Sequence, residues 1–260
     1  MLKNTFIHLP GIGEKTERHL WKSGIITWTD LLNAGRGDLP RGLGLDHLKC
    51  DLELSIKSYT EGSWKYFDSR IPLNHKWRAY PDLADKALYL DIETTGFGND
   101  ITVIGIYDGV KARTYVADIN LEQAVDDIER FPLVITFNGT RFDMPVIRQR
   151  FPYNMFEHIH IDLMYPLRKL GYRGGLKRIE EMTGLCRSGG TAGLTGWDAV
   201  KLWREYRGGR KDSLDRLLRY NEEDVMNLKP LMERTCRESI AGMDVYPAVS
   251  PDRFANSPGI

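Results

Sequence analysis

Cysteine is scarce in this chain and long hydrophobic runs are missing, and each absence narrows the class of protein. The 260 residues include only Cys50, Cys186 and Cys236, which form neither a C-x-x-C metal pair nor a disulfide framework. No apolar run approaches the roughly 18 residues of a membrane span, and the first residues lead straight into globular-looking sequence without a secretory signal. We therefore expect a cytoplasmic protein with no membrane association.

An excess of charge of either sign is also missing. Lys plus Arg and Asp plus Glu both number 36, so composition alone does not indicate a nucleic-acid-binding protein. Between Arg168 and Arg219, however, there are thirteen basic residues and six acidic ones. Five aromatic residues lie in or next to this region: Tyr165, Tyr172, Trp197, Trp203 and Tyr206. Cations neutralise phosphates and aromatic rings stack on unpaired bases; the alternative is a solvated helix face with aromatic side chains in the core.

The N-terminal region carries a glycine-bearing turn of the kind that binds phosphate. Leu9-Pro10-Gly11-Ile12-Gly13 predicts a tight turn, followed by an amphipathic helix that ends near Gly24. Glycines let backbone N–H groups approach an anion, and a helix N-terminus favours negative charge. The segment resembles the hairpin of helix-hairpin-helix DNA-binding modules, and a plain helical turn with glycine caps is the alternative. The contacts that the resemblance implies are Gly11, Gly13 and Lys15.

A fainter repeat of this hairpin at residues 39–44 follows a predicted helix at 27–34. The next stretch mixes prolines and aromatics without a sustained period. We expect a small all-α helix-hairpin-helix domain at residues 1–60, a connector at 61–85, an α/β domain at 86–240 and a loosely ordered tail at 241–260.

From Lys86 onward, strand and helix patterns alternate. A strand at 87–92 is followed by strands at 101–107 and 112–116, which Asp108-Gly109 joins as a hairpin. A helix at 121–130 precedes a short apolar strand at 133–137. Further helices are expected at residues 144–150, 176–185, 197–207 and from 217 past 228. This order predicts a mixed sheet flanked by helices, the arrangement of the ribonuclease-H-like fold.

The first strand carries two carboxylates on one face. Asp91 and Glu93 are two residues apart, so their side chains point the same way. Like charges this close raise each other's pKa unless a cation intervenes, and hard divalent ions such as Mg²⁺ take oxygen ligands of this kind. For an isolated pair, a solvated strand end is the alternative.

Later segments carry further acidic groups. Asp143 begins a helix, where an N-cap is the alternative to a metal ligand. Tyr220 and Asp224 are four residues apart and share one helical face. A strand face shared by His158, His160 and Asp162 fits either a metal site or a polar strand edge.

Taken in order, three of these segments resemble the exonuclease motifs of the DEDD superfamily, the ribonuclease-H-like 3′–5′ exonucleases. The motifs are Asp91-x-Glu93, Asn138-Gly139-x-x-Phe142-Asp143 and Tyr220-x-x-x-Asp224. The resemblance covers residues 86 to 235 and is closest to the YprB-type proteins, given Thr136-Phe137-Asn138-Gly139 and the helix at 197–207. Tyr220 stands in place of a histidine one residue earlier, a position that is Arg219 here, which indicates the tyrosine (DEDDy) subclass.

The resemblance implies a two-metal site with Mg²⁺ or Mn²⁺. Asp91 would bridge two divalent ions, with Glu93 and Asp224 completing one site and Asp143 the other, while Tyr220 would orient the attacking water. Substrate contacts are also implied, with Phe97 against the terminal base and Asn138 supporting Asp143 or touching the phosphate. The residues expected to contact substrate are Thr94, Thr95, Phe97 and Asn138.

The resulting prediction is a metal-dependent 3′–5′ exonuclease that hydrolyses single-stranded nucleic acid, with DNA favoured over RNA. Its partners would be DNA or RNA 3′ ends, and duplex DNA through the hairpin. Two alternatives stay open: a catalytically inactive nucleic-acid-binding protein, and a structure-specific endonuclease with the same metal site. Ribose discrimination needs a contact to the 2′-hydroxyl, and the sequence identifies none.

Overall fold

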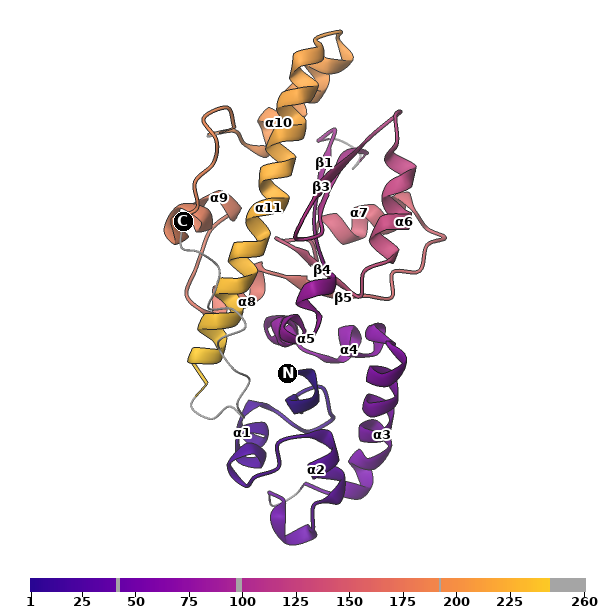
Figure 1. The fold of residues 1–260 in the computed structure, drawn as a ribbon, viewed down its shortest axis with the longest axis vertical. Helices are drawn as coiled ribbons and strands as arrows, with labels where there is room; N and C mark the ends of the chain where they lie inside the picture. Colours follow the sequence, from indigo (N-terminus) through magenta and orange to yellow (C-terminus); the bar gives the residue numbers. More distant parts are fainter. Residues whose placement is uncertain (41–42, 97–99, 192, 244–260) are drawn as a thin grey trace.

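A five-stranded mixed sheet stands between two helical layers, and a further group of helices lies beyond one end of it (Figure 1). The computed structural model describes residues 1–40, 43–96, 100–191 and 193–243. The predicted tail lies almost wholly outside these residues. The predicted α/β class, with a mixed sheet flanked by helices and an all-helical region before it, is confirmed.

The strand order is β3-β2-β1-β4-β5. The central strand β1 is antiparallel to β2 and parallel to β4, while β3 extends the sheet beside β2 and β5 lies parallel to β4. β1 runs two residues further than predicted, because its pairing with β2 continues through Glu93 and a bulge to Thr94. The strands are β1 (Ala87–Thr94), β2 (Ile101–Tyr107), β3 (Ala112–Val116), β4 (Leu133–Thr136) and β5 (Ile159–Asp162).

The hairpin between β2 and β3 is present, but its loop has four residues instead of two. Tyr107 pairs with Ala112, which leaves residues 108–111 to turn the chain. The Asp108 carboxylate accepts hydrogen bonds from the backbone N–H groups of Val110 and Lys111 at 2.9 and 2.7 Å. This side chain therefore closes the longer loop.

The helices of this region match the predicted segments, with three differences. The helix at Met164–Lys169 was not predicted. The predicted helix at 121–130 begins with a 3₁₀ turn, and the last helix is much longer than expected and contains Pro230. The helices are η5 (Leu121–Gln123), α6 (Ala124–Glu129), α7 (Asp143–Arg150), α8 (Met164–Lys169), α9 (Leu176–Thr183), α10 (Gly196–Arg207) and α11 (Lys211–Ala241).

The alternation of β1 decides which side chains face which layer. Leu88, Leu90 and Ile92 pack in an apolar cluster with residues of α6 and α7. Tyr89 points the other way and shares a cluster with Leu228 and Leu231 of α11. Asp91 and Glu93 follow Tyr89 at intervals of two, so they face α11.

The N-terminal region is helical throughout. Residues 61–86, expected to be mainly a connector, fold into short helices with buried side chains such as Phe67 and Trp77. The sequence showed no period here because 3₁₀ turns and very short helices repeat no single spacing. The elements are η1 (Leu2–Asn4), α1 (Glu14–Lys22), α2 (Trp28–Asn33), η2 (Arg36–Asp38), α3 (Leu45–Glu61), α4 (Trp64–Arg70), η3 (Leu73–Ala79), α5 (Tyr80–Leu83) and η4 (Ala84–Lys86).

The N-terminal helices share a core with the sheet. Leu20 of α1 and Leu52 of α3 belong to the same buried cluster as Tyr89 and Leu133 of the sheet. A buried ion pair also joins the two regions. Arg78 of η3 donates from Nη1 to both carboxylate oxygens of Glu17 on α1 at 2.8 Å, and both side chains are buried. Removing one partner of a buried ion pair costs several kcal/mol, because the charge that remains is uncompensated.

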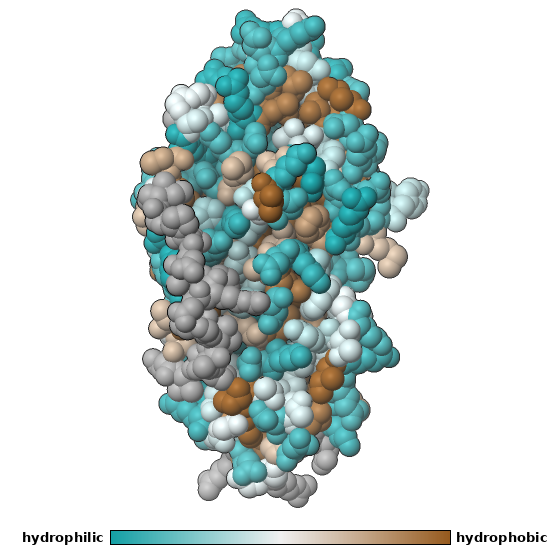
Figure 2. Space-filling model, in the orientation of Figure 1, coloured by the Kyte–Doolittle hydropathy of each residue, from teal (hydrophilic) through white to brown (hydrophobic). Residues whose placement is uncertain are grey.

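The surface shown in Figure 2 is mostly hydrophilic, with apolar side chains in small separate patches. Throughout the described part of the chain, no helix combines the length and apolar character that crossing a bilayer requires.

Candidate active site

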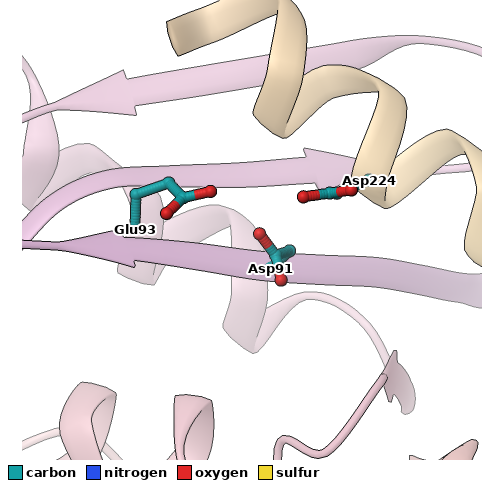
Figure 3. A group of neighbouring side chains, drawn as sticks. All are labelled: Asp91, Glu93 and Asp224. Atoms are coloured by element: carbon teal, nitrogen blue, oxygen red, sulfur yellow. The ribbon is translucent and has the colours of Figure 1, made fainter. Parts of the chain in front are cut away.

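Three carboxylates from two elements meet between the sheet and α11. Asp91 and Glu93 come from β1 and Asp224 comes from α11, and Figure 3 shows their carboxylate groups gathered in the space between the strand and the helix. One oxygen of each lies within 4.8 Å of the others. Oxygens at this spacing can share one hard divalent cation.

Asp143 is the fourth predicted carboxylate, and it comes from the other side of β1. It is the first residue of α7, and its Oδ1 accepts a hydrogen bond from the backbone N–H of Ile92 at 3.1 Å. The alternative role as an N-cap is wrong, because Phe142 holds that position and the Asp143 side chain reaches across to β1 instead. One carboxylate oxygen is thereby anchored next to Asp91.

Burial and mutual repulsion raise the pKa of all four carboxyls. Burial is the largest cause for Asp91 and for Glu93, followed by the charges of Asp224 and Asp143. Burial raises the pKa of Asp143 to about 7, against hydrogen bonds from backbone N–H groups that lower it. Burial also raises the pKa of Asp224 to about 6, although Arg187 beside it acts in the opposite direction. Such a group resists ionisation unless cations approach it, so the donor set fits divalent metal ions.

Asn221 is a neighbour of the site that the sequence analysis missed. Its side-chain NH₂ donates to Asp91 Oδ2 at 2.9 Å. The amide lies against Gly105 of β2, where a Cβ atom would stand 1.9 Å from Asn221 Oδ1. The hydrogen bond from Asn221 therefore orients Asp91, and it forms only because residue 105 on the facing strand is a glycine.

Two cations, also missed, lie beside Asp224. The Arg187 guanidinium bonds Asp224 and makes two hydrogen bonds to Glu180, from Nε at 2.6 Å and from Nη2 at 2.7 Å. Lys177 stands over the ring of Tyr220, 4.5 Å from its centre. No pairwise spacing marked these residues in the sequence; the excess of basic residues after Arg168 was the one signal that could have found them.

Tyr220 is the buried phenol of the site. Burial raises its pKa, and the carboxylates of Asp224, Glu93 and Asp91 act in the same direction. The ring lies one turn before Asp224 on α11, beneath the cationic groups of Lys177 and Arg187. The phenol is therefore a close neighbour of the carboxylate cluster.

The turn that carries Asn138 is held by Asp162. Asn138 has a φ of 64°, a left-handed conformation that asparagine tolerates. Its N–H donates to Asp162 Oδ1 at 2.7 Å, and the N–H of Thr140 donates to Oδ2 at 3.0 Å. Asp162 thus orients the segment that leads into Asp143.

The alternative metal site on β5 finds no support. His158 and His160 are buried, and His160 Nε2 lies 2.8 Å from the Thr136 hydroxyl. Within the residues that the structure describes, the grouped metal-type ligands are Asp91, Glu93 and Asp224 and include neither histidine. β5 is an edge strand of the sheet, as the alternative of a polar strand edge predicted, but its polar side chains are buried.

The remaining residues predicted to contact substrate lie where β1 ends. Thr94 is buried and its hydroxyl accepts from the N–H of Gly96 at 3.3 Å, while Thr95 is half-buried. Phe97, predicted to contact the terminal base, lies outside the described residues.

The predicted hairpin residues lie at the far end of the chain from these carboxylates. Gly11 has a φ of 74°, Gly13 is the N-cap of α1, and both are exposed, as is Lys15. The Glu14 carboxylate in the same turn accepts a hydrogen bond from Lys169 of α8 at 2.8 Å, and this hydrogen bond lowers the pKa of Glu14 to about 2. The turn is open to solvent and its first helical residue is tied to the α/β region.

A family model described as the RNase_H superfamily matches residues 88–236, more than half of the chain. No curated protein matches the chain. The matched segment contains all five strands and all four carboxylates. Members of this superfamily are generally hydrolytic nucleases that use divalent metal ions. The sheet order, the facing helix α11 and this match together show that the chain belongs to the RNase_H superfamily.

Proposed function

We propose that this protein is a metal-dependent 3′–5′ exonuclease of the tyrosine DEDD subclass, acting on single-stranded nucleic acid and favouring DNA over RNA. Membership of the RNase_H superfamily supports nuclease-type hydrolysis. The observation that carries the proposal is the meeting of Asp91, Glu93 and Asp224, whose oxygens lie within 4.8 Å of one another. The position of Asp143 on the other side of β1 supports a second cation site.

Four residues would hold two divalent ions, Mg²⁺ or Mn²⁺. Asp91 would contribute to both sites, Glu93 and Asp224 to one, and Asp143 to the other. When bound, such ions activate water and neutralise charge at the scissile phosphate and the leaving 3′ oxygen. The chain itself aims the carboxylates, because Asn221 orients Asp91 and the backbone N–H of Ile92 orients Asp143.

Other residues would position the reactants. Tyr220 lies one turn before Asp224 on α11 and would orient the attacking water through its hydroxyl. Lys177 and Arg187 would offset negative charge beside Asp224 as the phosphate enters. Thr94, Thr95 and Asn138 would line the substrate, and the hairpin of Gly11, Gly13 and Lys15 would bind duplex DNA through its phosphates.

The experiment is a gel assay of the purified protein with 5′-labelled single-stranded DNA and RNA in Mg²⁺, Mn²⁺ or EDTA. We expect a ladder that shortens from the 3′ end and disappears in EDTA. Asp91→Ala should remove cleavage and keep strand binding, whereas Asp126→Ala, on an exposed part of α6, should cleave normally. A discrete internal cut would identify an endonuclease. An intact strand that shifts on a native gel under every metal condition would identify a binding protein instead.

A further inference from the structure

One aromatic side chain of the basic region stands out by its exposure. Trp203 is buried in the core at 7% exposed, and Tyr165, Tyr172 and Tyr206 are partly buried. Trp197 is 69% exposed. Large aromatic side chains contribute their hydrophobic surface to cores and interfaces, so an indole left in solvent on a polar helix needs a reason.

Trp197 lies at the edge of the candidate active site. A Cβ atom on Gly96 would stand 3.6 Å from Trp197 Cζ3 and 3.0 Å from Val200 Cγ2, so the start of α10 packs directly against the turn that ends β1. Gly96 is three residues after Glu93, and three residues span at most about 11 Å. The indole is therefore within a few nucleotide spacings of the carboxylates.

The exposed face of α10 continues from this indole as a row of cations. Lys201 and Arg204 follow Trp197 at intervals of four and three, which places all three on one helical face, and all three are exposed. The opposite face is buried against the sheet. Two acidic residues of the helix lie near this row, and both have other partners. The Asp198 carboxylate caps the helix, where it accepts from the backbone N–H and the hydroxyl of Thr195 at 2.8 and 2.7 Å, and the Glu205 carboxylate accepts from the hydroxyl of Ser213 at 2.8 Å and pairs with Arg210 at 3.0 Å.

We propose that this face of α10 binds the single strand that leads into the active site, with the Trp197 indole stacked on a base close to the 3′ end and Lys201 and Arg204 beside the following phosphates. The chemistry is that of an aromatic platform next to a positively charged path, which fits single-stranded nucleic acid of any sequence because every base has a π-face. This inference rests on the proposed function and names how that function recognises its substrate. It also explains why a tryptophan occupies a solvent-facing position of the helix.

The test compares full-length variants in an Asp91→Asn background, so that the strand is bound without being cut. Fluorescence anisotropy measures the dissociation constant for a labelled oligothymidylate and for the same strand carrying abasic sites near its 3′ end. Trp197→Ala should weaken binding of the oligothymidylate by about 5- to 150-fold, the loss of one stacked base. Trp197→Phe should recover most of it, and the abasic strand should bind the parent and Trp197→Ala equally.

Tyr153→Ala is the matched control. Tyr153 is 97% exposed and lies in the loop before β5. Because β5 is parallel to β4 and β4 to β1, this loop is at the opposite end of the sheet from Gly96. Tyr153→Ala should bind both strands like the parent. Lys201→Gln should lower the salt dependence of binding by about one phosphate contact.

The inference is overturned if Trp197→Ala binds the oligothymidylate as tightly as Tyr153→Ala, or if it loses equal affinity for the base-containing and abasic strands. A parent variant that binds neither strand would overturn it as well. Cleavage by the wild-type protein is scored separately on the gel. A normal 3′ ladder with unaltered binding by Trp197→Ala would reject this surface and leave the proposed function standing.

Discussion

Each carboxylate of the site is a side chain that folding places in an unfavourable setting. Asp143 and Asp224 have pKa values of about 7 and about 6, raised mainly by burial. In the unfolded chain both would titrate near the ordinary value of about 4. Without metal, these buried carboxyls therefore lower the free energy of unfolding. When cations bind, the ionised carboxylates become favourable.

This predicts a pH dependence of stability in EDTA. Around neutral pH the folded protein holds a proton on Asp143 that the unfolded chain has lost, so the free energy of unfolding falls as pH rises through about 7. Buried histidines with lowered pKa, such as His158 and His160, act in the opposite direction near pH 6.5, because the unfolded chain still holds about half a proton on each. Between pH 6.5 and pH 8 the Tm of the wild type should therefore fall relative to that of Asp143→Asn, in which these histidines are unchanged.

Two comparisons make the pH prediction specific. Asp143→Asn keeps the histidines and the other carboxyls of the site, so the difference between its Tm and that of the wild type isolates the proton on Asp143. Mn²⁺ at 100 times its Kd should stabilise the wild type at pH 8 by about 2.7 kcal/mol for each ion bound. A wild-type Tm in EDTA that stays level or rises relative to that of Asp143→Asn over this range would contradict the assigned direction.

Tyr220→Phe separates positioning from metal binding. Burial and the nearby carboxylates raise the pKa of Tyr220 and keep its hydroxyl neutral, so Mn²⁺ affinity measured by calorimetry should change little. Loss of the water-orienting group should slow single-turnover cleavage by about 100-fold. Tyr206→Phe, on α10, is the control and should cleave at the normal rate; an equally fast Tyr220→Phe variant would remove this phenol from the mechanism.

At the scale of elements, the sheet was predictable and the short helices were not. Residues 88–92 alternate between two buried faces and predict β1 without reference to the rest of the chain. Residues 61–86 contain Pro72 and Pro81 and turn by 3₁₀ geometry, so no repeating spacing marks their helices. The length of α11 was missed because its interior Pro230 is a helix breaker by local propensity.

The candidate site divides in the same way. The spacing of two placed Asp91 and Glu93 on one strand face, and the resemblance to the DEDD motifs implied that Asp224 joins them. The supporting contacts of Asn221 and Arg187 depend on which elements meet in space. Asn221 meets Asp91 only because α11 packs across β1 and β2, and Arg187 comes from an irregular loop without a spacing pattern.

The contact between α11 and β2 leads to a prediction at Gly105. Gly105→Ala would place a Cβ 1.9 Å from Asn221 Oδ1, so the amide must leave its position and release Asp91. We expect weaker Mn²⁺ binding and about tenfold or more slower cleavage, with a reduced Tm. Gly37→Ala, where an added Cβ meets nothing within 4 Å, is the control and should match the wild type. Unchanged metal affinity in Gly105→Ala would show that Asn221 does not orient the ligand.

For the whole molecule, the central question is how the N-terminal helices serve the α/β region. Their shared cluster, which includes Leu20, Leu52 and Leu133, makes removal of residues 1–60 a poor test of DNA binding, since the cut would expose a common core. The domain limits proposed from the sequence therefore mark a change of secondary structure within one packed unit. The hairpin's role is better tested by exchanging single exposed side chains.

Lys15→Gln is such a test. If the hairpin binds phosphates, this variant should bind long duplex DNA several-fold more weakly and lose about one unit of salt dependence, with unchanged cleavage of short single strands. Lys22→Gln, at the other end of α1, is exposed as well and should keep full duplex affinity. Equal affinity of both variants for duplex DNA would remove the hairpin's proposed role.

The common core has one more consequence, which concerns length. α1 and α10 lie toward opposite ends of the molecule (Figure 1), and Leu20 of α1 packs in one buried cluster with Tyr89 and Leu133 of the sheet. A duplex held at the hairpin would therefore present its strand at a fixed offset from the carboxylates. The protein would act as a ruler: a 3′ overhang shorter than this offset would stay uncut while the duplex is held, and longer overhangs would be trimmed back to one set length.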